Sequence, residues 1–332
     1  MKLKKCLKEF KAKGLKESRN QMSNKIIVIV GPTAVGKTHV SLELAKKLDT
    51  EIISADSMQI YKGMDVGTAK ITEEEKGGII HHMIDIVSPD EDYSVSEFKK
   101  DAEVIIDNLL LKNKIPVIVG GSGLYINSLI YDLDFGNTKS NDKIREYYTY
   151  YYKEHGEDAL YDKLMKIDPE SGEKIHKNNV KRVIRALEVY DITGRKFSEL
   201  NTDIRKESKK YDRILIGLSM ERKTLYERIN QRVDEMLSNG LVEEVRTLIE
   251  SGYDKNLVSM RGIGYKEIID YIEGNMDLEE ASYILKRNTR RFAKRQYTWF
   301  LRDKHIRWFS MDNMDDIDNT IKGISEYIGM KI

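Results

Sequence analysis

The chain has 332 residues, of which 40% are hydrophobic, enough to bury a large core in one big domain or two smaller ones. Lys and Arg number 56 against 55 Asp and Glu, so net charge says nothing about a nucleic-acid partner. The single cysteine, Cys6, excludes an internal disulfide framework and a cysteine-based zinc site. Because no apolar run reaches the length of a membrane span, we expect a cytoplasmic protein that does not enter a membrane.

Residues 1–24 are predicted to form a basic tail. Residues 1–25 contain nine Lys or Arg and two Glu. This start resembles that of a signal peptide, but no apolar stretch of signal length follows, so secretion is not expected. A solvated or partly helical appendage is favoured over an arm that binds polyanions.

Short apolar runs then alternate with helical patterns. Residues 26–30 (IIVIV) are a β-branched run that ends at Gly-Pro, which predicts a strand buried on both faces. The further elements predicted in this part are a helix at 39–48, strands at 51–54, 82–87 and 115–119, and a helix at 95–112. Such alternation of strands and helices predicts a parallel sheet.

Strand patterns are absent between about Gly136 and Lys210, where tyrosine-rich and charged helical sequence predicts an inserted subdomain. Residues 213–218 (RILIGL) predict a strand that returns to the sheet, and residues 222–304 predict helices joined by glycine-containing turns. The expected domains are the tail at 1–24, a catalytic domain made of 25–136 and 211–332, and a helical insertion at 137–210.

The sequence GPTAVGKT follows the first strand and precedes a helix, which is the context of a phosphate-binding P-loop. Its residues are Gly31, Pro32, Thr33, Ala34, Val35, Gly36, Lys37 and Thr38. The glycines let successive amides point at one anion, Lys37 adds a charge, and Thr38 adds a hydroxyl for Mg²⁺. The predicted fold class is therefore α/β, a P-loop kinase-like parallel sheet flanked by helices, with an inserted all-helical subdomain.

The loop alone does not say whether the bound phosphates belong to a nucleoside triphosphate. ATPases and GTPases usually hold their metal with an Asp that ends a later strand, but the strand at 115–119 ends in Gly120-Gly121-Ser122-Gly123. Asp85 is either a substitute metal ligand or a capping residue. Asp56 leaves the second strand at the edge that carries the P-loop, so it is either a general base beside the phosphates or a helix cap.

Seven segments occur in an order that resembles the tRNA dimethylallyltransferase family, over roughly residues 25 to 310. They are GPTAVGKT, SADSMQIYKGMDVGTAK, HHMID, GGSGLYI, NNVKRVIRALEV, RINQRVDEML and RFAKRQYTWF. The resemblance implies transfer of a dimethylallyl group from dimethylallyl diphosphate to the exocyclic amine of the adenosine immediately 3′ of the anticodon. It further implies Mg²⁺ as cofactor and the tRNA anticodon stem-loop as partner, and nothing in the chain requires more than a monomer.

This chemistry gives roles to five residues. Lys37 and a Thr38-bound Mg²⁺ would stabilise the leaving diphosphate, and Asp56 would take a proton from the attacking amine. The resemblance adds Arg232 as a cationic ligand of the diphosphate, although the pattern around it is also that of a solvated helix arginine. The adenosine must be flipped into the pocket, so we expect a channel with Asp56 and Ser122 near the point where donor and acceptor meet.

A basic, aromatic segment at 286–308 predicts an RNA-binding surface. It contains nine Lys or Arg and one acid, and Arg287, Arg291 and Arg295 recur at helical spacing. Its aromatic residues, Phe292, Tyr297, Trp299, Phe300 and Trp308, would stack on unpaired bases or, in the alternative, pack inward behind a solvated basic face. The resemblance favours RNA.

The resemblance extends the tRNA contacts to other segments, among which Gln59 would meet the edge of the flipped base. The expected tRNA contacts are Asp56, Ser57, Met58, Gln59, Ser122, Arg145, Lys181, Arg182, Arg185, Arg261, Gly264, Tyr265, Lys266, Lys294, Arg295, Gln296, Trp299 and Arg302. The consecutive tyrosines at 147–152 are interpreted as packing.

Three other functions share part of these features. A small-molecule kinase has the P-loop and an inserted lid, but it would need the missing strand-end acid. An isopentenyltransferase for free adenine nucleotides shares the chemistry but needs no basic RNA surface. A non-catalytic RNA-binding protein would keep the basic face and survive loss of Lys37 or Asp56.

Overall fold

The computed structural model describes residues 24–133, 141–200, 208–312 and 317–331. These residues form two compact units, which divide between Ile130 and Tyr131 and again between Ser208 and Lys209. The predicted tail lies outside the described residues except for Asn24. Among the described residues, no helix is long and apolar enough to cross a membrane.

The first unit is built on a six-stranded parallel sheet. Its strands are β1 (Lys25–Val30), β2 (Ile52–Ser54), β3 (His81–His82), β4 (Val117–Gly120), β5 (Asp212–Ser219) and β6 (Arg307–Ser310). Their order is β3-β2-β4-β1-β5-β6, and every neighbouring pair is parallel. The P-loop therefore leaves the sheet between β4 and β5, where open α/β sheets bind ligands.

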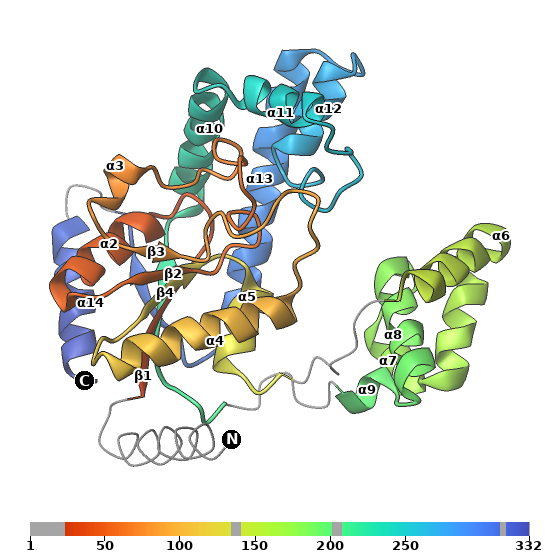
Figure 1. The fold of residues 1–332 in the computed structure, drawn as a ribbon, viewed down its shortest axis with the longest axis horizontal. Helices are drawn as coiled ribbons and strands as arrows, with labels where there is room; N and C mark the ends of the chain where they lie inside the picture. The colour runs from red at the N-terminus through yellow and green to blue at the C-terminus, as the bar shows by residue number, and fades with distance from the viewer. Residues whose placement is uncertain (1–23, 134–140, 201–207, 313–316, 332) are drawn as a thin grey trace, which may run out of the picture. The chain divides into compact units, whose positions relative to one another are not determined.

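Helices cover both faces of this sheet (Figure 1). The helices of the unit are α2 (Lys37–Leu48), α3 (Glu73–Lys76), α4 (Val95–Leu111), α5 (Gly123–Ile130), α10 (Arg222–Ser238), α11 (Leu241–Glu250), α12 (Tyr265–Ile272), α13 (Leu278–Phe300) and α14 (Ile317–Gly329), of which α11 packs on α10 and α12 on α13. Ile27 and Ile29 share a buried cluster with α2 and α14, and the alternate residues of β1 are buried by the opposite layer, which contains α4 and α5. The predicted parallel α/β sheet flanked by helices is confirmed.

The second unit is helical throughout its described part. Its helices are α6 (Asp142–Ile167), α7 (Pro169–Lys174), α8 (Val180–Thr193) and α9 (Phe197–Leu200). α6 and α8 pack around Leu160, Leu164, Val183 and Leu187, all of which are buried. Each helix turns one apolar stripe toward this core, so the apolar residues of the segment recur at helical spacing and not in the alternation of a strand.

One expectation about the elements was wrong. The strand predicted at 82–87 is reduced to His81–His82, because Met83 (φ 64°) and Asp85 (φ 55°) adopt left-handed backbone conformations that a strand does not permit. No element was predicted beyond residue 304, where the structure has the edge strand β6, which is short and only half-buried.

The segment between β2 and α3 carries several residues of the site, and α11 holds it in place. Glu244 Oε2 accepts hydrogen bonds from the amides of Asp65 (2.8 Å) and Val66 (2.7 Å), and Oε1 accepts one from the Gly67 amide (3.0 Å). The hydroxyl of Tyr265, which is fully buried, also donates to Oε1 at 2.7 Å. One carboxylate thus satisfies four donors that would otherwise lack a partner.

We expect Glu244→Gln to destabilise the protein by about 1–3 kcal/mol, because whichever carboxylate oxygen becomes an amide leaves two donors without an acceptor. Urea unfolding measures the effect. Glu243→Gln is the matched control, since Glu243 lies in the same first turn of α11 and is exposed. Equal free energies of unfolding for the two variants would contradict this role of Glu244.

Candidate active site

The P-loop has the backbone needed to surround an anion. Gly36 has φ 101°, a conformation that strongly favours glycine, and α2 begins at the next residue, Lys37. The first amides of α2 therefore point out of the helix beside the loop, and Thr38 is exposed at this end. The local geometry is that of a phosphate site.

A cavity of about 690 Å³ opens over this loop. It is lined by Thr33, Ala34, Gly36, Lys37, Thr38, His39, Asp56, Gln59, Asp65, Val66, Thr68, Ala69, Lys70, Ile71, Thr72, Glu75, Arg228, Gln231, Arg232, Glu235, Met236, Asn239, Phe292 and Gln296. These residues come from the P-loop and the first turn of α2, the segment from β2 into α3, α10 with the residue that follows it, and α13. The structure thus brings Lys37, Asp56 and Arg232 to one cavity, as predicted from the sequence.

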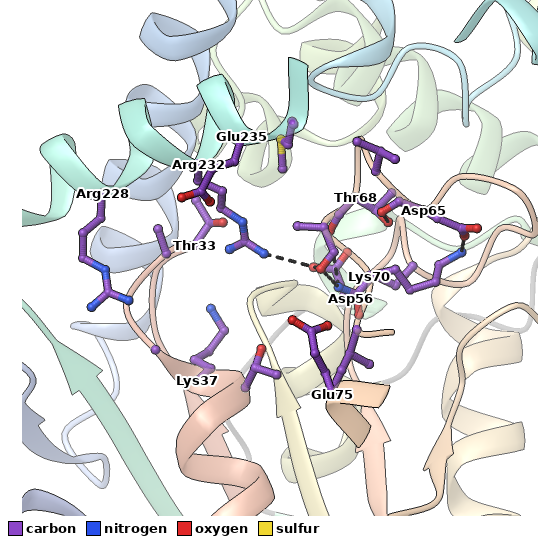
Figure 2. A pocket seen from close by; sticks show the side chains of 18 of the residues that line it. Thr33, Lys37, Asp56, Asp65, Thr68, Lys70, Glu75, Arg228, Arg232 and Glu235 are labelled. Atoms are coloured by element: carbon purple, nitrogen blue, oxygen red, sulfur yellow. Dashed lines mark hydrogen bonds and ion pairs between the residues drawn. The ribbon is translucent and has the colours of Figure 1, made fainter. Parts of the chain in front are cut away.

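Lys37 rises from the start of α2 beneath Arg228 and Arg232 (Figure 2). Its Nζ donates hydrogen bonds to the carbonyl oxygens of Gly31 (3.0 Å) and Pro32 (2.7 Å). The surrounding protein removes water from the ammonium group and lowers its pKa to about 7; Asp56 opposes this shift, and Arg232 adds to it. An anion bound here would raise the pKa again.

Arg232 reaches the cavity from α10, and Figure 2 shows it directed toward Asp56. Its guanidinium donates a hydrogen bond to the Ala69 carbonyl at 3.4 Å. Burial lowers the pKa of Arg232, while the charge of Asp56 opposes the change. A solvated helix arginine, the other interpretation of the sequence, would show no such burial.

Arg228 also lines the cavity, one helical turn before Arg232, and Figure 2 shows both descending from α10 toward the P-loop. Arg228 was not among the residues predicted from the sequence. The i, i+4 spacing of the two arginines was a signal that could have identified it, because that spacing places them on one helix face.

Asp56 lies in the tight turn that follows β2. Its Oδ1 accepts the Met58 amide at 2.9 Å, and no described residue donates to Oδ2. The Ser57 amide donates to Ser122 Oγ at 2.9 Å, and Ser122 Oγ donates to Ser57 Oγ at 3.1 Å. The turn is thereby fixed from β4, and Asp56 presents one carboxylate oxygen to a substrate.

Ser122 and Gln59 are both bonded to protein groups. Ser122 is not among the residues that line the cavity, and its hydroxyl holds the turn that carries Asp56. Gln59 does line the cavity, but its carboxamide is engaged with protein groups. Its Oε1 accepts from Ser54 at 3.1 Å, and Nε2 makes long bonds to the carbonyls of Thr68 and Ala69.

Asp85 was considered as a metal ligand, and its contacts argue against that role. It forms an ion pair with Lys70 at 2.6 Å, which also pairs with Asp65 at 2.5 Å, and it does not line the cavity. Among the described residues, no group of three or more His, Cys, Asp or Glu could hold a metal ion. Thr38 remains, and a single hydroxyl suits Mg²⁺ that takes its other ligands from substrate phosphates and water.

The basic face predicted on α13 is partly formed. Arg291, Lys294, Arg295, Trp299 and Arg302 are exposed. Their neighbours on the helix are engaged: Lys286 pairs with Asp234, Arg290 donates to Asn230, and Arg287 is partly buried.

The aromatic residues divide between the two alternatives. Phe300 is buried, and Tyr297 packs edge-on against Trp308 of β6, so these three pack inward. Phe292 lines the cavity. Trp299 keeps 38% of its surface exposed while its ring lies over Gly123. Trp299 is therefore the aromatic residue of this segment best placed to meet RNA.

Three other predicted tRNA contacts lie inside the protein. Tyr265 is fully buried with its hydroxyl on Glu244, and Gly264 is buried with its amide on Glu267. Gln296 is buried and bonds to two loops of the protein. These residues are corrected to structural positions, whereas their neighbours Arg261 and Lys266 are exposed.

In the second unit, the predicted contacts surround one buried acid. Glu188 accepts hydrogen bonds from Arg145 Nε (2.9 Å), Arg185 Nη1 (2.7 Å) and the Asn141 amide (2.7 Å). Burial raises the pKa of Glu188, but these three donors outweigh it and the net shift is downward. Arg145 and Arg185 thus neutralise an internal charge, while Lys181 and Arg182 are exposed on α8.

Comparison with known proteins gives a consistent result. A family model described as IPP transferase matches residues 59–304, and one described as isopentenyl transferase matches residues 24–85. The tRNA dimethylallyltransferase of Alkaliphilus oremlandii is 54% identical over 298 residues, covering 90% of this chain and 95% of that protein. That of Acetivibrio thermocellus is 52% identical over 303 residues, covering 91% and 97%.

Solved structures agree. The full-length tRNA isopentenylpyrophosphate transferase of Bacillus halodurans superposes with a TM-score of 0.70 at 45% identity, covering 93% of this chain and 97% of that one. A eukaryotic dimethylallyltransferase acting on tRNA gives a TM-score of 0.77 at 30% identity, covering 91% and 77%. The resemblance inferred from the seven motifs is confirmed, and the chain belongs to the IPP transferase family.

Proposed function

We propose that this protein transfers the dimethylallyl group of dimethylallyl diphosphate to the exocyclic amine of the adenosine 3′-adjacent to the anticodon in tRNA, forming N6-isopentenyladenosine and diphosphate. The observation that carries this proposal is a P-loop whose Lys37 lies in one cavity with a second cation, Arg232, and with the carboxylate of Asp56, whose charge acts on both cations. Membership of the family supports it. The protein would act in the cytoplasm as a monomer.

The cations suit a diphosphate that leaves. When the carbon–oxygen bond of the donor breaks, negative charge grows on the diphosphate, and partly dehydrated cations stabilise that charge more strongly than water does. Lys37 and Arg232 are both held in a desolvated position before the donor arrives. Mg²⁺ at Thr38, bound together with the phosphates, would add Lewis-acid stabilisation of the same charge.

Asp56 suits the opposite task. The exocyclic amine of adenosine is a weak nucleophile, and its attack on the donor carbon leaves a proton to be removed. Oδ1 is held by the Met58 amide, which fixes the carboxylate, and Oδ2 remains to accept that proton. The second unit and the exposed face of α13 are proposed to hold the anticodon stem-loop, so that the flipped base reaches Asp56.

The proposal is tested by incubating the protein with dimethylallyl diphosphate, Mg²⁺ and either unmodified tRNA or AMP, followed by mass spectrometry of the acceptor. We expect the five-carbon group on tRNA and none on AMP. Asp56→Asn should lower the single-turnover rate about 10²–10⁴-fold at unchanged tRNA affinity, because the isosteric amide cannot take the proton.

Three results would contradict the proposal. Transfer to AMP alone would indicate a free-nucleotide enzyme, and ATP turnover without RNA would indicate a kinase. Full single-turnover activity of Asp56→Asn would show that Asp56 is not the general base. Asp65→Asn is the matched control, since Asp65 lines the same cavity but is paired with Lys70. This substitution should lower the single-turnover rate less than Asp56→Asn does.

The lowered pKa of Lys37 predicts that donor binding takes up a proton. Without ligand, Lys37 is mostly neutral at pH 8, whereas the bound diphosphate raises its pKa and keeps it charged. Binding at pH 8 should therefore take up about one proton. If Lys37 is the only group that titrates, the affinity for the donor should be constant below pH 7 and should fall about tenfold per pH unit above pH 7.

Calorimetry of donor binding in buffers with different ionisation enthalpies measures this uptake. Lys37→Arg is the control, because its guanidinium stays charged and uptake should fall close to zero. Equal proton uptake by the wild type and Lys37→Arg would show that another group is responsible.

Arg291 and Arg295 are predicted to contact tRNA phosphates. The double variant Arg291→Ala/Arg295→Ala should weaken tRNA binding and reduce the slope of log K against log salt by about 1.5, because fewer counterions are released. The control variant Arg246→Ala/Lys322→Ala removes the same charge from exposed positions on α11 and α14. An identical salt slope for the two double variants would refute the α13 surface.

A further inference from the structure

Helix α13 has two faces with different contacts. Phe292 and Gln296, four residues apart, both line the cavity, whereas Trp299, three residues further on, lies over Gly123 and keeps 38% of its surface exposed. Arg291 and Arg295 directly precede Phe292 and Gln296 in the sequence and are exposed. One helix thus carries both the proposed RNA surface and a row of residues directed at the catalytic loops.

Gln296 makes the most specific contacts of the inner row. Its Oε1 accepts a hydrogen bond from the Thr33 amide at 2.8 Å, and its Nε2 donates to the Gly121 carbonyl at 3.1 Å. Only 6% of its surface is exposed. Thr33 belongs to the P-loop after β1, and Gly121 belongs to the turn after β4, so the side chain bridges the loops of two neighbouring strands.

A carboxamide fits this place because it both donates and accepts. A carboxylate would put a second oxygen against the Gly121 carbonyl, and an apolar side chain would leave a backbone amide and a carbonyl without partners. The approach is close: a Cβ added to Gly121 would lie 2.1 Å from Nε2. The turn after β4 therefore accommodates the bridge only with glycine at this position.

We infer that Gln296 is a positioning residue for the diphosphate loop and not a tRNA contact. Its bond to Thr33 fixes one P-loop amide away from the ligand, which sets the orientation of the amides that follow it. Its bond to Gly121 ties the loop to the turn whose Ser122 holds the Asp56 segment. This inference deepens the proposed function and rests on it in one respect, since it takes Gly31–Thr38 as the diphosphate site.

The test measures the dissociation constants of inorganic pyrophosphate with Mg²⁺ and of unmodified tRNA, for variants of the full chain. Gln296→Met keeps the length of the side chain and removes both hydrogen bonds. We expect pyrophosphate binding to weaken about tenfold, which corresponds to the loss of roughly one net hydrogen bond, while tRNA binding stays within about twofold. In the transfer assay, KM for dimethylallyl diphosphate should rise and KM for tRNA should not.

Gly121→Ala breaks the bridge from the other side. The added methyl group displaces the flexible end of Gln296 rather than backbone, so the variant should fold and show the same selective loss of pyrophosphate affinity. Arg295→Ala is the matched control on the exposed face of the same helix. It should weaken tRNA binding and leave pyrophosphate binding unchanged.

Two outcomes overturn the inference. Weaker tRNA binding with normal pyrophosphate binding in Gln296→Met would make Gln296 an RNA contact, and a lowered melting temperature with both affinities unchanged would make it a packing residue only. Because pyrophosphate binding is measured without an acceptor, these results stand even if the protein transfers no dimethylallyl group to tRNA. If the wild type transferred no dimethylallyl group to tRNA, but Gln296→Met still lost affinity for pyrophosphate and not for tRNA, the proposed function would be refuted and the role of Gln296 would stand.

Discussion

The placement of two cations in a desolvated cavity is the constraint on which the rest of the structure depends. Lys37 and Arg232 oppose one another's charge, and burial disfavours the charged form of each. Asp56 is the acid that offsets both. Such a site is costly for a protein without ligand, and a bound diphosphate would reverse that cost. In the proposed reaction the group that stabilises the site would also be the group that leaves, so binding and chemistry would share one cavity.

This site is assembled from segments that meet only through tertiary contacts. Gln296 of α13 joins the P-loop to the turn after β4, Ser122 of that turn holds the Asp56 segment, and Glu244 of α11 holds the amides of residues 65–67. Each contact satisfies backbone groups that buried loops would otherwise leave without partners. The sheet places the loops, and helices from the second half of the chain fix their conformations.

Sequence patterns predicted the parts of this site that depend on local structure. The P-loop was found from its glycine spacing after β1, and Asp56 from its place at the end of a predicted strand. Glu244 was missed because nothing next to it in the sequence marks what it touches, and β6 because a short, half-exposed edge strand has no strong alternation. Arg228 was missed although its spacing of four residues from Arg232 places both on one helix face. The left-handed residues Met83 and Asp85 ended a strand that composition alone had favoured.

The predicted RNA surface shows a different limit. A resemblance transfers residues by position, and it does not separate those that touch a substrate from those that hold the fold. Tyr265 and Gln296 came with the family motifs as expected tRNA contacts, yet both are buried and bonded to protein groups. Burial and hydrogen-bond partners make that distinction, and they leave the exposed side chains of α13 and α8 as the candidates for RNA.

The central proposal is that the P-loop holds the diphosphate of an isoprenoid donor with the donor's reactive carbon toward Asp56. A crystal structure with dimethylallyl thiodiphosphate and Mg²⁺ tests it most directly. We predict that the diphosphate lies between Lys37 and Arg232 and that the first carbon of the dimethylallyl group points to Asp56. A diphosphate bound away from Gly31–Thr38, or a dimethylallyl group directed away from Asp56, would contradict the claim.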